Sequence, residues 1–216
     1  MPVSPPAPVP QPAPVQVVVA THNPHKIAEL QRILGAVLPE LELLPYDGPA
    51  PVEDGDTFAA NALIKARAAA AHTGMPAIAD DSGVSVDALS GAPGIDSAHY
   101  SGQRDDAANL QLVLTNLGQQ SNRAAHFTCA AALVDPLDVD GDGGAAFEHV
   151  ELGVWHGAIA LEPAGVGGFG YDPIFIPTGM PVTSAEISPD EKNAISHRGL
   201  AFAALARVLA ARTHRS

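Results

Sequence analysis

VQVVVATHNPHK, residues 15–26, joins a strand to a helix through one short turn. The β-branched run at 15–20 is typical of a strand buried on both faces of a sheet. Asn23 suits the N-cap of the helix that follows, Pro24 suits its first position, and apolar residues recur at helical spacing as far as Val37. A buried strand that leads directly into a helix predicts an α/β fold.

The turn between this strand and helix is also a candidate anion site. Backbone amides at a helix N-terminus and the helix dipole favour a negative group, and Thr21, Asn23 and Lys26 add donors. The turn lacks the glycine spacing and the Lys-Ser/Thr pair of a Walker loop. Ordinary helix capping explains the same residues, so the turn by itself leaves both interpretations open.

The charge balance narrows the kind of ligand. The chain carries 24 acidic and 11 basic side chains, a net charge of −13, and its lysines are Lys26, Lys65 and Lys192. A nucleic-acid polymer needs a broad basic stripe and is therefore not expected as a partner. Each lysine lies in a polar or glycine-flanked segment, which favours a small polyphosphate ligand over chance surface positions. Because carboxylates and phosphates both prefer hard cations, we expect Mg²⁺ to bridge them.

Length and composition, with 46% hydrophobic residues, predict a single domain at 15–216. Residues 1–14, MPVSPPAPVPQPAP, have the composition of a disordered proline-rich tail and not of a signal peptide. No apolar run approaches the ~20 residues that span a bilayer, so no membrane association is expected. The single cysteine, Cys129, lies in an apolar run and is expected to be a core thiol. A lone cysteine without an export signal indicates the cytoplasm.

Polar residues between positions 53 and 65 are candidates for a shared site. A predicted helix at 57–72 places Asn61 and Lys65 one turn apart on the same face. Glu53 lies in the acidic loop just before this helix. We therefore expect Glu53 to reach the site that this helix face lines.

Two adjacent acids follow the next predicted strand. Residues 77–79 are expected to form a short strand that ends in Asp80-Asp81-Ser82-Gly83. Adjacent carboxylates at the mouth of a buried strand are costly unless a cation or donors compensate them, and α/β sheets bind ligands beyond the strand carboxyl ends. A metal site and an ordinary DDSG turn are both consistent with this segment.

The middle of the chain predicts a loop, a helix and an antiparallel strand pair, at 90–102, 105–117, and 126–134 with 146–160. In the connection between the two strands, Asp138, Asp140, Asp142 and Gly143 imitate the start of a calcium loop. The twelfth position is His149 and not glutamate, and strands flank the connection. We therefore expect a solvated hairpin loop.

The glycine-rich stretch GVGGFGYDP, residues 165–173, is a candidate base pocket. Glycines let the backbone approach a ligand closely, Phe169 and Tyr171 offer flat faces, and Asp172 offers a polar edge. A glycine-rich turn around a buried phenylalanine is the alternative interpretation. The last predicted helix, at 197–212, begins with His-Arg, where its positive end favours an anion or a polar base edge.

Five segments occur together in a recognisable order and spacing. They are THNPHK (21–26), DTFAANALIKA (56–66), AIADDSGVSVDALSGAPGIDSAHYSG (77–102), GGFGYDPIF (167–175) and AEISPDEKNAISHRG (185–199). In these segments the chain resembles the inosine triphosphate pyrophosphatase family, the (d)ITP/XTP diphosphatases that remove non-standard purine nucleotides. The resemblance extends over residues 15–212.

The resemblance implies a fold, an assembly and a role for each matching residue. The fold would be a long, twisted, mixed β-sheet flanked by helices in two lobes with a central nucleotide cleft, and the protein would be a homodimer. The metal Mg²⁺ would be held by Glu53 and Asp81, with Asp81 also the proton acceptor and Asp80 its support. The substrate would be contacted by Thr21, His22, Asn23, Pro24, His25, Lys26, Asn61, Lys65 and Ser82 around the phosphates, by Phe169, Gly170, Tyr171 and Asp172 at the purine, and by Lys192, His197 and Arg198 at its 6-oxo edge.

The activity that the resemblance implies is hydrolysis of ITP, dITP and XTP to the monophosphate and pyrophosphate. Water activated by magnesium would attack the α-phosphorus, a carboxylate would take its proton, and Lys26 and Lys65 would stabilise the leaving pyrophosphate. Two alternatives are a nucleotide-sensing module and a metal-dependent nucleotide phosphatase of other base preference. The presence of both Glu53 and Asp81 favours an enzyme, and product analysis separates the remaining classes.

The chain departs from the family pattern at three places. It has His22 or His25 where the family usually has a small residue, and Ala60 where the family has glutamate. It also has His99 where the family motif SARY has arginine. The loss of that arginine puts in doubt any contact, to ligand or across a dimer, that needs a permanent charge.

Overall fold

The computed structural model describes residues 15–22, 24–139 and 145–213, so the expected tail at 1–14 lies outside the described residues. The elements in chain order are β1 (Val15–Val19), α1 (Pro24–Gly35), β2 (Leu41–Pro45), α2 (Phe58–Thr73), β3 (Ala77–Val86), η1 (Asp87–Leu89), η2 (Gly94–Asp96), α3 (Asp106–Leu117), β4 (Ala124–Val139), β5 (Ala146–Ile159), η3 (Asp172–Ile174), β6 (Phe175–Pro177), α4 (Pro189–Ile195) and α5 (His197–Thr213). The predicted helices at the N-terminus, in the middle and at the C-terminus are all confirmed.

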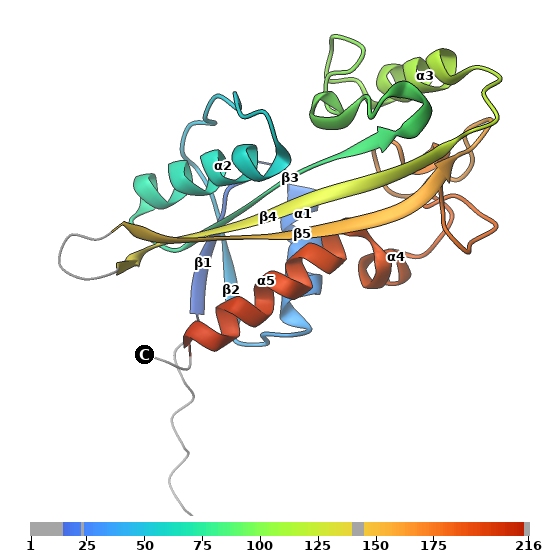
Figure 1. The fold of residues 1–216 in the computed structure, drawn as a ribbon. Coiled ribbons are helices and arrows are strands. Elements are labelled where there is room, and N and C mark those ends of the chain that lie inside the picture. Colours follow the sequence, from blue (N-terminus) through green and yellow to red (C-terminus); the bar gives the residue numbers. More distant parts are fainter. Residues whose placement is uncertain (1–14, 23, 140–144, 214–216) are drawn as a thin grey trace, which may run out of the picture.

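One mixed sheet organises these elements. Its strand order is β2-β1-β3-β4-β5-β6, with parallel pairs among β2, β1 and β3 and antiparallel pairs from β3 to β6. The long strands β3, β4 and β5 run through the whole length of the molecule (Figure 1). The predicted antiparallel strand pair and the α/β class are therefore confirmed.

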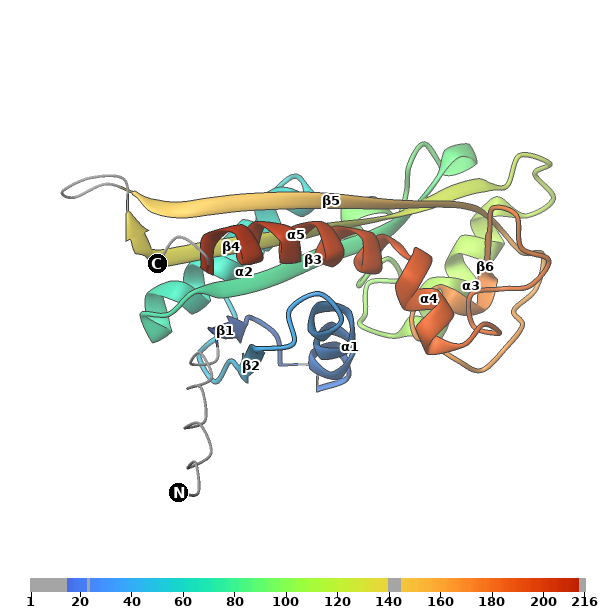
Figure 2. The same cartoon turned by 90° about the horizontal axis from the view of Figure 1, so that it is seen from below.

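Helices cover both faces of the sheet. Helix α2 packs on one face, and α5 lies along β4 on the other face beside α1 (Figures 1 and 2). The α5 face buries the larger apolar side chains, among them Val17, Leu30, Leu34, Ile78, Leu133, Phe202 and Leu205. The α2 face is built largely from alanines, among them Ala62, Ala66, Ala69, Ala79, Ala130 and Ala132. Small side chains let α2 approach the sheet closely.

A third core cluster lies at the α3 end of the long strands. It joins α3 to the far ends of β3, β4 and β5 and to the glycine-rich segment, through Val84, Val86, Val113, Leu117, Phe127, Trp155, Tyr171, Ile174 and Phe175. This cluster is the core of a second lobe, which the three long strands connect to the first (Figure 1). The two lobes that the resemblance implied are thus present.

The expected strand end at Ala79 is wrong. Strand β3 continues to Val86 and pairs with β4 along its whole length, from Ala77 opposite Val134 to Val86 opposite Ala125. Its other edge pairs with β1 only at Ala77 and Ile78. The DDSG segment is therefore neither a turn nor a strand end, but the part of β3 whose second edge has become free.

Two short elements were not anticipated, β6 and α4. Helix α4 begins with a capping box, in which Ser188 and Glu191 each bond the other's backbone N–H. Strand β4 extends to Val139, while positions 140 to 144 of the calcium-like connection lie outside the described residues.

Cys129 is fully buried, as expected of a core thiol, and burial raises its pKa.

Among the described residues, no single helix is long and apolar enough to cross a membrane. The pair Pro189–Ile195 and His197–Arg212, bent by 63° at its break, meets the length and composition criteria only when joined.

Candidate active site

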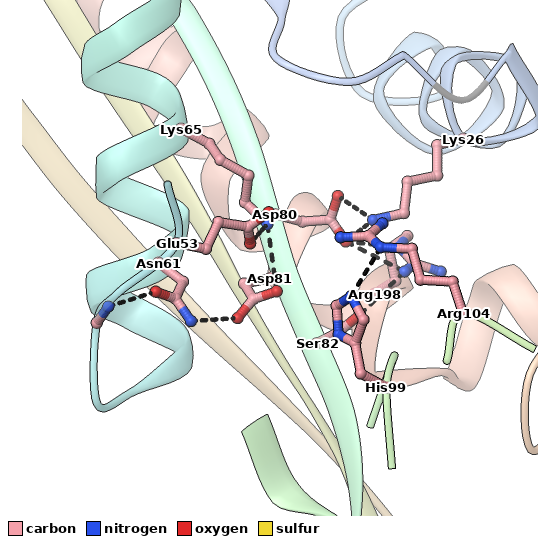
Figure 3. A network of polar contacts seen from close by, with 11 residues as sticks. Lys26, Glu53, Asn61, Lys65, Asp80, Asp81, Ser82, His99, Arg104 and Arg198 are labelled. Atoms are coloured by element: carbon pink, nitrogen blue, oxygen red, sulfur yellow. Dashed lines mark hydrogen bonds and ion pairs between the residues drawn. The ribbon is translucent and has the colours of Figure 1, made fainter. Parts of the chain in front are cut away.

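A cleft of about 500 Å³ lies between the two lobes, beside the free edge of β3. It brings together side chains from segments that are far apart in the sequence (Figure 3). The predicted site residues that line it are Lys26, Glu53, Asn61, Lys65, Asp81, Ser82, Phe169, Gly170, Tyr171, Asp172, Lys192, His197 and Arg198. The five sequence segments thus contribute to one site.

On the α5 side of the cleft, the Asp80 carboxylate binds two cationic side chains. Lys26 Nζ, from the first turn of α1, lies 3.0 Å from both oxygens of the Asp80 carboxylate. Arg198, from the start of α5, donates from Nε at 3.2 Å and from an Nη at 3.1 Å to Asp80 Oδ2. Burial by itself raises the pKa of Asp80, but the charges of Lys26 and Arg198 outweigh it and hold the pKa well below its ordinary value.

Arg198 is buried and makes several hydrogen bonds to other protein side chains. Besides Asp80, it donates to Ser82 Oγ at 3.1 Å and to Glu29 Oε2 at 3.3 Å, and its side chain is 2% exposed. A buried guanidinium with two carboxylate partners is a structural ion-pair network as much as a ligand contact. A contact between Arg198 and the purine edge would therefore have to use N–H groups that already bind Asp80, Ser82 or Glu29.

Asp81 belongs to the opposite wall, which α2 forms. Asn61 Nδ2 donates to Asp81 Oδ2 at 3.3 Å, and Lys65 Nζ donates to Asp81 Oδ1 at 3.2 Å. The same Lys65 ammonium donates to Glu53 Oε2 at 2.6 Å. Asn61 is oriented in turn because its Oδ1 accepts from the Gly55 backbone N–H at 2.8 Å.

The Glu53–Asp81 pair provides hard oxygen donors of the kind that Mg²⁺ prefers. Lys65 lies between the two carboxylates and marks the position where they attract a cation (Figure 3). Burial raises the pKa of Asp81, Lys65 opposes this effect, and Glu53 adds to it. Among the described residues no three His, Cys, Asp or Glu side chains converge as a ready metal centre. The donor set thus fits a metal that takes most of its remaining ligands from substrate and water.

The glycine-rich segment is held at the opposite end of the cleft by Asp172. This buried carboxylate accepts from Lys192 Nζ at 2.5 Å, from Ser184 Oγ at 2.8 Å and from the Phe169 backbone N–H at 2.8 Å. Gly168 has a φ of 70°, and a Cβ there would collide with the Asp172 carboxylate. The glycine is therefore required by both its backbone conformation and this close approach.

Two aromatic features at this end fit a flat ligand. Phe169 is 46% exposed, and Lys192 Nζ and the Arg198 guanidinium lie 5.3 and 5.4 Å from its ring centre. His197 stacks on Phe127 with ring centres 4.6 Å apart. His197 Nδ1 is buried and, among the described residues, has no hydrogen-bond partner. An unsatisfied buried polar atom beside a cleft is the kind of group that a ligand completes.

Part of the N-terminal turn does not reach this cleft. His22 Nε2 lies 3.0 Å from the Gly48 carbonyl oxygen and its ring lies beside Tyr46, so it faces away from the site, and Thr21 does not line the cleft either. The prediction for Asn23 lies outside the described residues. Pro24 begins α1, and the side chains of Pro24 and His25 also lie outside what the structure describes.

The structure adds residues that the motifs did not single out. Asp106, at the start of α3, accepts from the Gly170 backbone N–H at 2.9 Å and ties α3 to the glycine-rich segment. Arg104 also lines the cleft, and its Nε donates to His99 Nε2 at 2.8 Å. Neither lies in a pattern specific enough to have been found from one sequence.

The fold and cleft define an α/β protein with a binding site for a small anionic ligand between two lobes. The chain belongs to the Ham1 family, whose model matches residues 17–208. It is 56% identical over 200 residues to a dITP/XTP pyrophosphatase of Leifsonia xyli subsp. xyli, covering 91% of this chain and 96% of the relative.

Solved structures show the same likeness. A HAM1 protein from Coxiella burnetii superimposes with a TM-score of 0.80 at 43% identity, covering 91% of this chain and 98% of that one. A nucleoside-triphosphatase and dITP/XTP pyrophosphatase from Mycobacterium abscessus gives a TM-score of 0.69 at 47% identity, covering 88% and 98%. The expected fold class is thereby confirmed.

Proposed function

We propose that the protein hydrolyses non-standard purine nucleoside triphosphates, namely ITP, dITP and XTP, to the monophosphate and pyrophosphate. The dITP/XTP pyrophosphatases that resemble the chain over most of its length support this activity. The cleft supports it as well, because one end carries cations and carboxylates and the other carries an exposed aromatic ring with polar neighbours. The observation that carries the proposal is the Glu53–Lys65–Asp81 group, which combines metal-binding carboxylates with a phosphate-binding cation.

In this proposal the phosphate chain lies over Lys26, Lys65 and the two carboxylates. Glu53 and Asp81 would hold Mg²⁺, which when bound neutralises phosphate oxygens and lowers the pKa of water. Lys65 contacts both carboxylates and would donate from its ammonium to a phosphate oxygen of the bound substrate. Lys26 would keep the leaving pyrophosphate at the N-terminal end of α1, where positive charge is concentrated.

Asp81 is the residue proposed to accept a proton from the attacking water. Its carboxylate is 18% exposed and has one ammonium and one amide as its partners. Asp80 is a poor candidate for this role, because Lys26 and Arg198 occupy both of its oxygens and it is nearly inaccessible. We therefore assign Asp80 to holding the two cations in place.

Recognition of the purine is assigned to the other end of the cleft. A 6-oxo group accepts hydrogen bonds, whereas the 6-amino group of adenine donates them. Lys192 supplies N–H groups beside Phe169, so adenine would leave donors unpaired there. His197, whose Nδ1 has no hydrogen-bond partner among the described residues, lines the same cleft. Arg198 contributes charge to the same region through its position beside the Phe169 ring.

Product analysis with ITP tests the proposal. The protein is incubated with ITP and Mg²⁺, and the products are separated and quantified. IMP and pyrophosphate in equal amounts are expected. IDP with orthophosphate indicates a phosphatase, and unchanged ITP indicates a binding module, so either result contradicts the proposal. Assembly as a homodimer and a location in the cytoplasm stay predictions.

A further inference from the structure

Five cationic side chains line the cleft among the described residues, and one of them differs from the rest. Lys26, Lys65, Lys192 and Arg198 each lie within 4 Å of a carboxylate. Arg104 has no carboxylate within that distance among the residues that the structure describes. Its positive charge is therefore the least neutralised in the cleft. In a chain with a net charge of −13, such a cation is a strong point of attraction for an anion.

Arg104 is held in position by His99. The Arg104 Nε–H donates to His99 Nε2 at 2.8 Å, so this ring nitrogen is the acceptor of the pair. This bond uses one of the five N–H groups of the guanidinium, and within the described part of the chain the other four make no hydrogen bond. In Figure 3 the Arg104 side chain projects from its loop toward the side of the cleft that holds Lys26 and Asp80.

The loop that carries both residues is itself fixed to the second lobe. Asn109 of α3, 1% exposed, accepts from the Ser101 backbone N–H at 2.7 Å and donates to the Ala98 carbonyl oxygen at 3.1 Å. Ser97, also buried, binds the Val84 backbone N–H at 3.0 Å and so connects the loop to β3. The backbone of the loop that carries Arg104 is therefore constrained, so less conformational entropy is lost when the guanidinium binds an anion.

We propose that Arg104 binds the phosphate chain of the nucleotide on its pyrophosphate side, and that His99 orients it for this contact. The inference rests on the proposed function, because it assigns one more residue to the same substrate. It also accounts for His99 at the position of the family's arginine. In this chain the permanent charge comes from Arg104, while the residue at position 99 positions that charge. A planar guanidinium whose edge between the two Nη groups is not used by His99 matches two phosphate oxygens better than an imidazole does.

The two products of the reaction separate this proposal from its alternative, a contact between Arg104 and the base. Binding of pyrophosphate and of IMP, each with Mg²⁺, is measured by calorimetry for the wild type and for Arg104→Ala. We expect the affinity for pyrophosphate to fall roughly 5- to 20-fold, since charge-assisted hydrogen bonds at a partly exposed site are lost. Binding of IMP should stay within about twofold. Equal pyrophosphate binding by the two proteins, or a selective loss of IMP binding, overturns the proposal.

Matched variants test whether Arg104 binds the phosphates and whether His99 orients Arg104. Arg32→Ala removes an equally permanent charge from an exposed position on α1 and should leave pyrophosphate binding unchanged. His99→Ala should weaken pyrophosphate binding and His99→Gln should retain it, because a glutamine side-chain oxygen also accepts from Arg104 Nε. If His99→Ala binds pyrophosphate as tightly as the wild type, His99 does not orient Arg104 for this contact.

Pyrophosphate release from ITP by the wild type and by Arg104→Ala tests the proposed function and the role of Arg104 separately. If wild type releases no pyrophosphate from ITP, the proposed function fails and the inference fails with it. If wild type does release it, and kcat/KM for ITP is the same in Arg104→Ala, only the inference about Arg104 is overturned.

Discussion

Asp80 and Asp81 are neighbours in β3, yet their carboxylates face opposite sides of the sheet and bind different cations. Successive side chains of a strand alternate between its faces, so Asp80 meets Lys26 and Arg198 while Asp81 meets Lys65. The free edge of β3 beyond Ile78 leaves room for a ligand beside both. One carboxylate therefore assembles the site, and the other remains available for chemistry.

This division predicts that Asp81→Asn removes activity without loss of folding. Replacement of the proposed base should lower kcat for ITP on the order of 10² to 10⁴-fold. Thermal unfolding should change little, because the asparagine still bonds Asn61. Asp87→Asn, at an exposed position just after β3, is the matched control and should keep wild-type activity. An Asp81→Asn protein with a third of the normal rate would contradict the assignment.

The partner residue Arg198 is expected to act mainly on stability. Arg198→Ala leaves the buried Asp80 carboxylate with Lys26 alone, and breaking such a pair costs about 3 to 5 kcal/mol of unfolding free energy. The double variant with Asp80→Asn should be more stable than the sum of the two single losses predicts, because it no longer contains the buried Asp80 carboxylate that Arg198→Ala leaves undercompensated. Denaturant unfolding of the four proteins measures this coupling. Strictly additive losses would mean that the two residues do not interact energetically.

The phosphate end of the cleft predicts an effect without base selectivity. Lys26→Met and Lys65→Met should each lower kcat/KM for ITP and ATP by similar factors, since both nucleotides carry the same phosphate chain. The ratio of kcat/KM for ITP over ATP should therefore stay near its wild-type value. A ratio that collapses while ATP hydrolysis is untouched would place the lysine concerned at the base.

His197 predicts a pH dependence of stability. Burial lowers the pKa of His197 well below its ordinary value, and the charges of Arg198 and Lys192 lower it further. Below about pH 6.5 the unfolded chain therefore binds a proton that the folded chain does not. The unfolding free energy should fall as the pH drops, by up to ~1.4 kcal/mol per pH unit from this residue.

Urea unfolding between pH 7.5 and 5.5 measures this contribution. His197→Gln should show a smaller decrease in stability over this range than the wild type. His72→Gln, at an exposed histidine, should leave the decrease nearly as it is in the wild type. Identical pH dependences for wild type and His197→Gln would show that His197 titrates alike in both states.

The elements were predictable where local chemistry decides them. The β-branched run at β1, the Pro24 start of α1 and the Asp105 cap of α3 all follow from a few neighbouring residues. The continuation of β3 through two acids was not predictable, because it depends on pairing with β4 some fifty residues later. Local turn propensity indicated the opposite, and tertiary pairing prevailed.

The site shows the same limit. Lys26, Glu53, Lys65 and Asp81 were assigned from motifs, and the structure brings them to one cleft. The THNPHK segment also placed His22 beside the phosphates, but the His22 ring lies against Gly48 and Tyr46. A short turn does not determine the direction in which its side chains point. Arg104 lies in a loop whose position relative to the cleft depends on α3, so one sequence alone could not reveal it.

Selectivity for 6-oxo purine triphosphates is what the purine end of the cleft is proposed to provide, and a panel of kcat/KM values for ITP, XTP, GTP and ATP with Mg²⁺ measures it. The Lys192 ammonium can only donate hydrogen bonds and should leave N–H groups unpaired against adenine, so ITP and XTP should exceed ATP by ~10⁴-fold or more. GTP shares the 6-oxo group, so the ATP value is the decisive comparison. We expect rapid pyrophosphate release from ITP and XTP and very slow release from ATP, and ATP hydrolysis as fast as ITP hydrolysis would show that the cleft does not select the 6-oxo group.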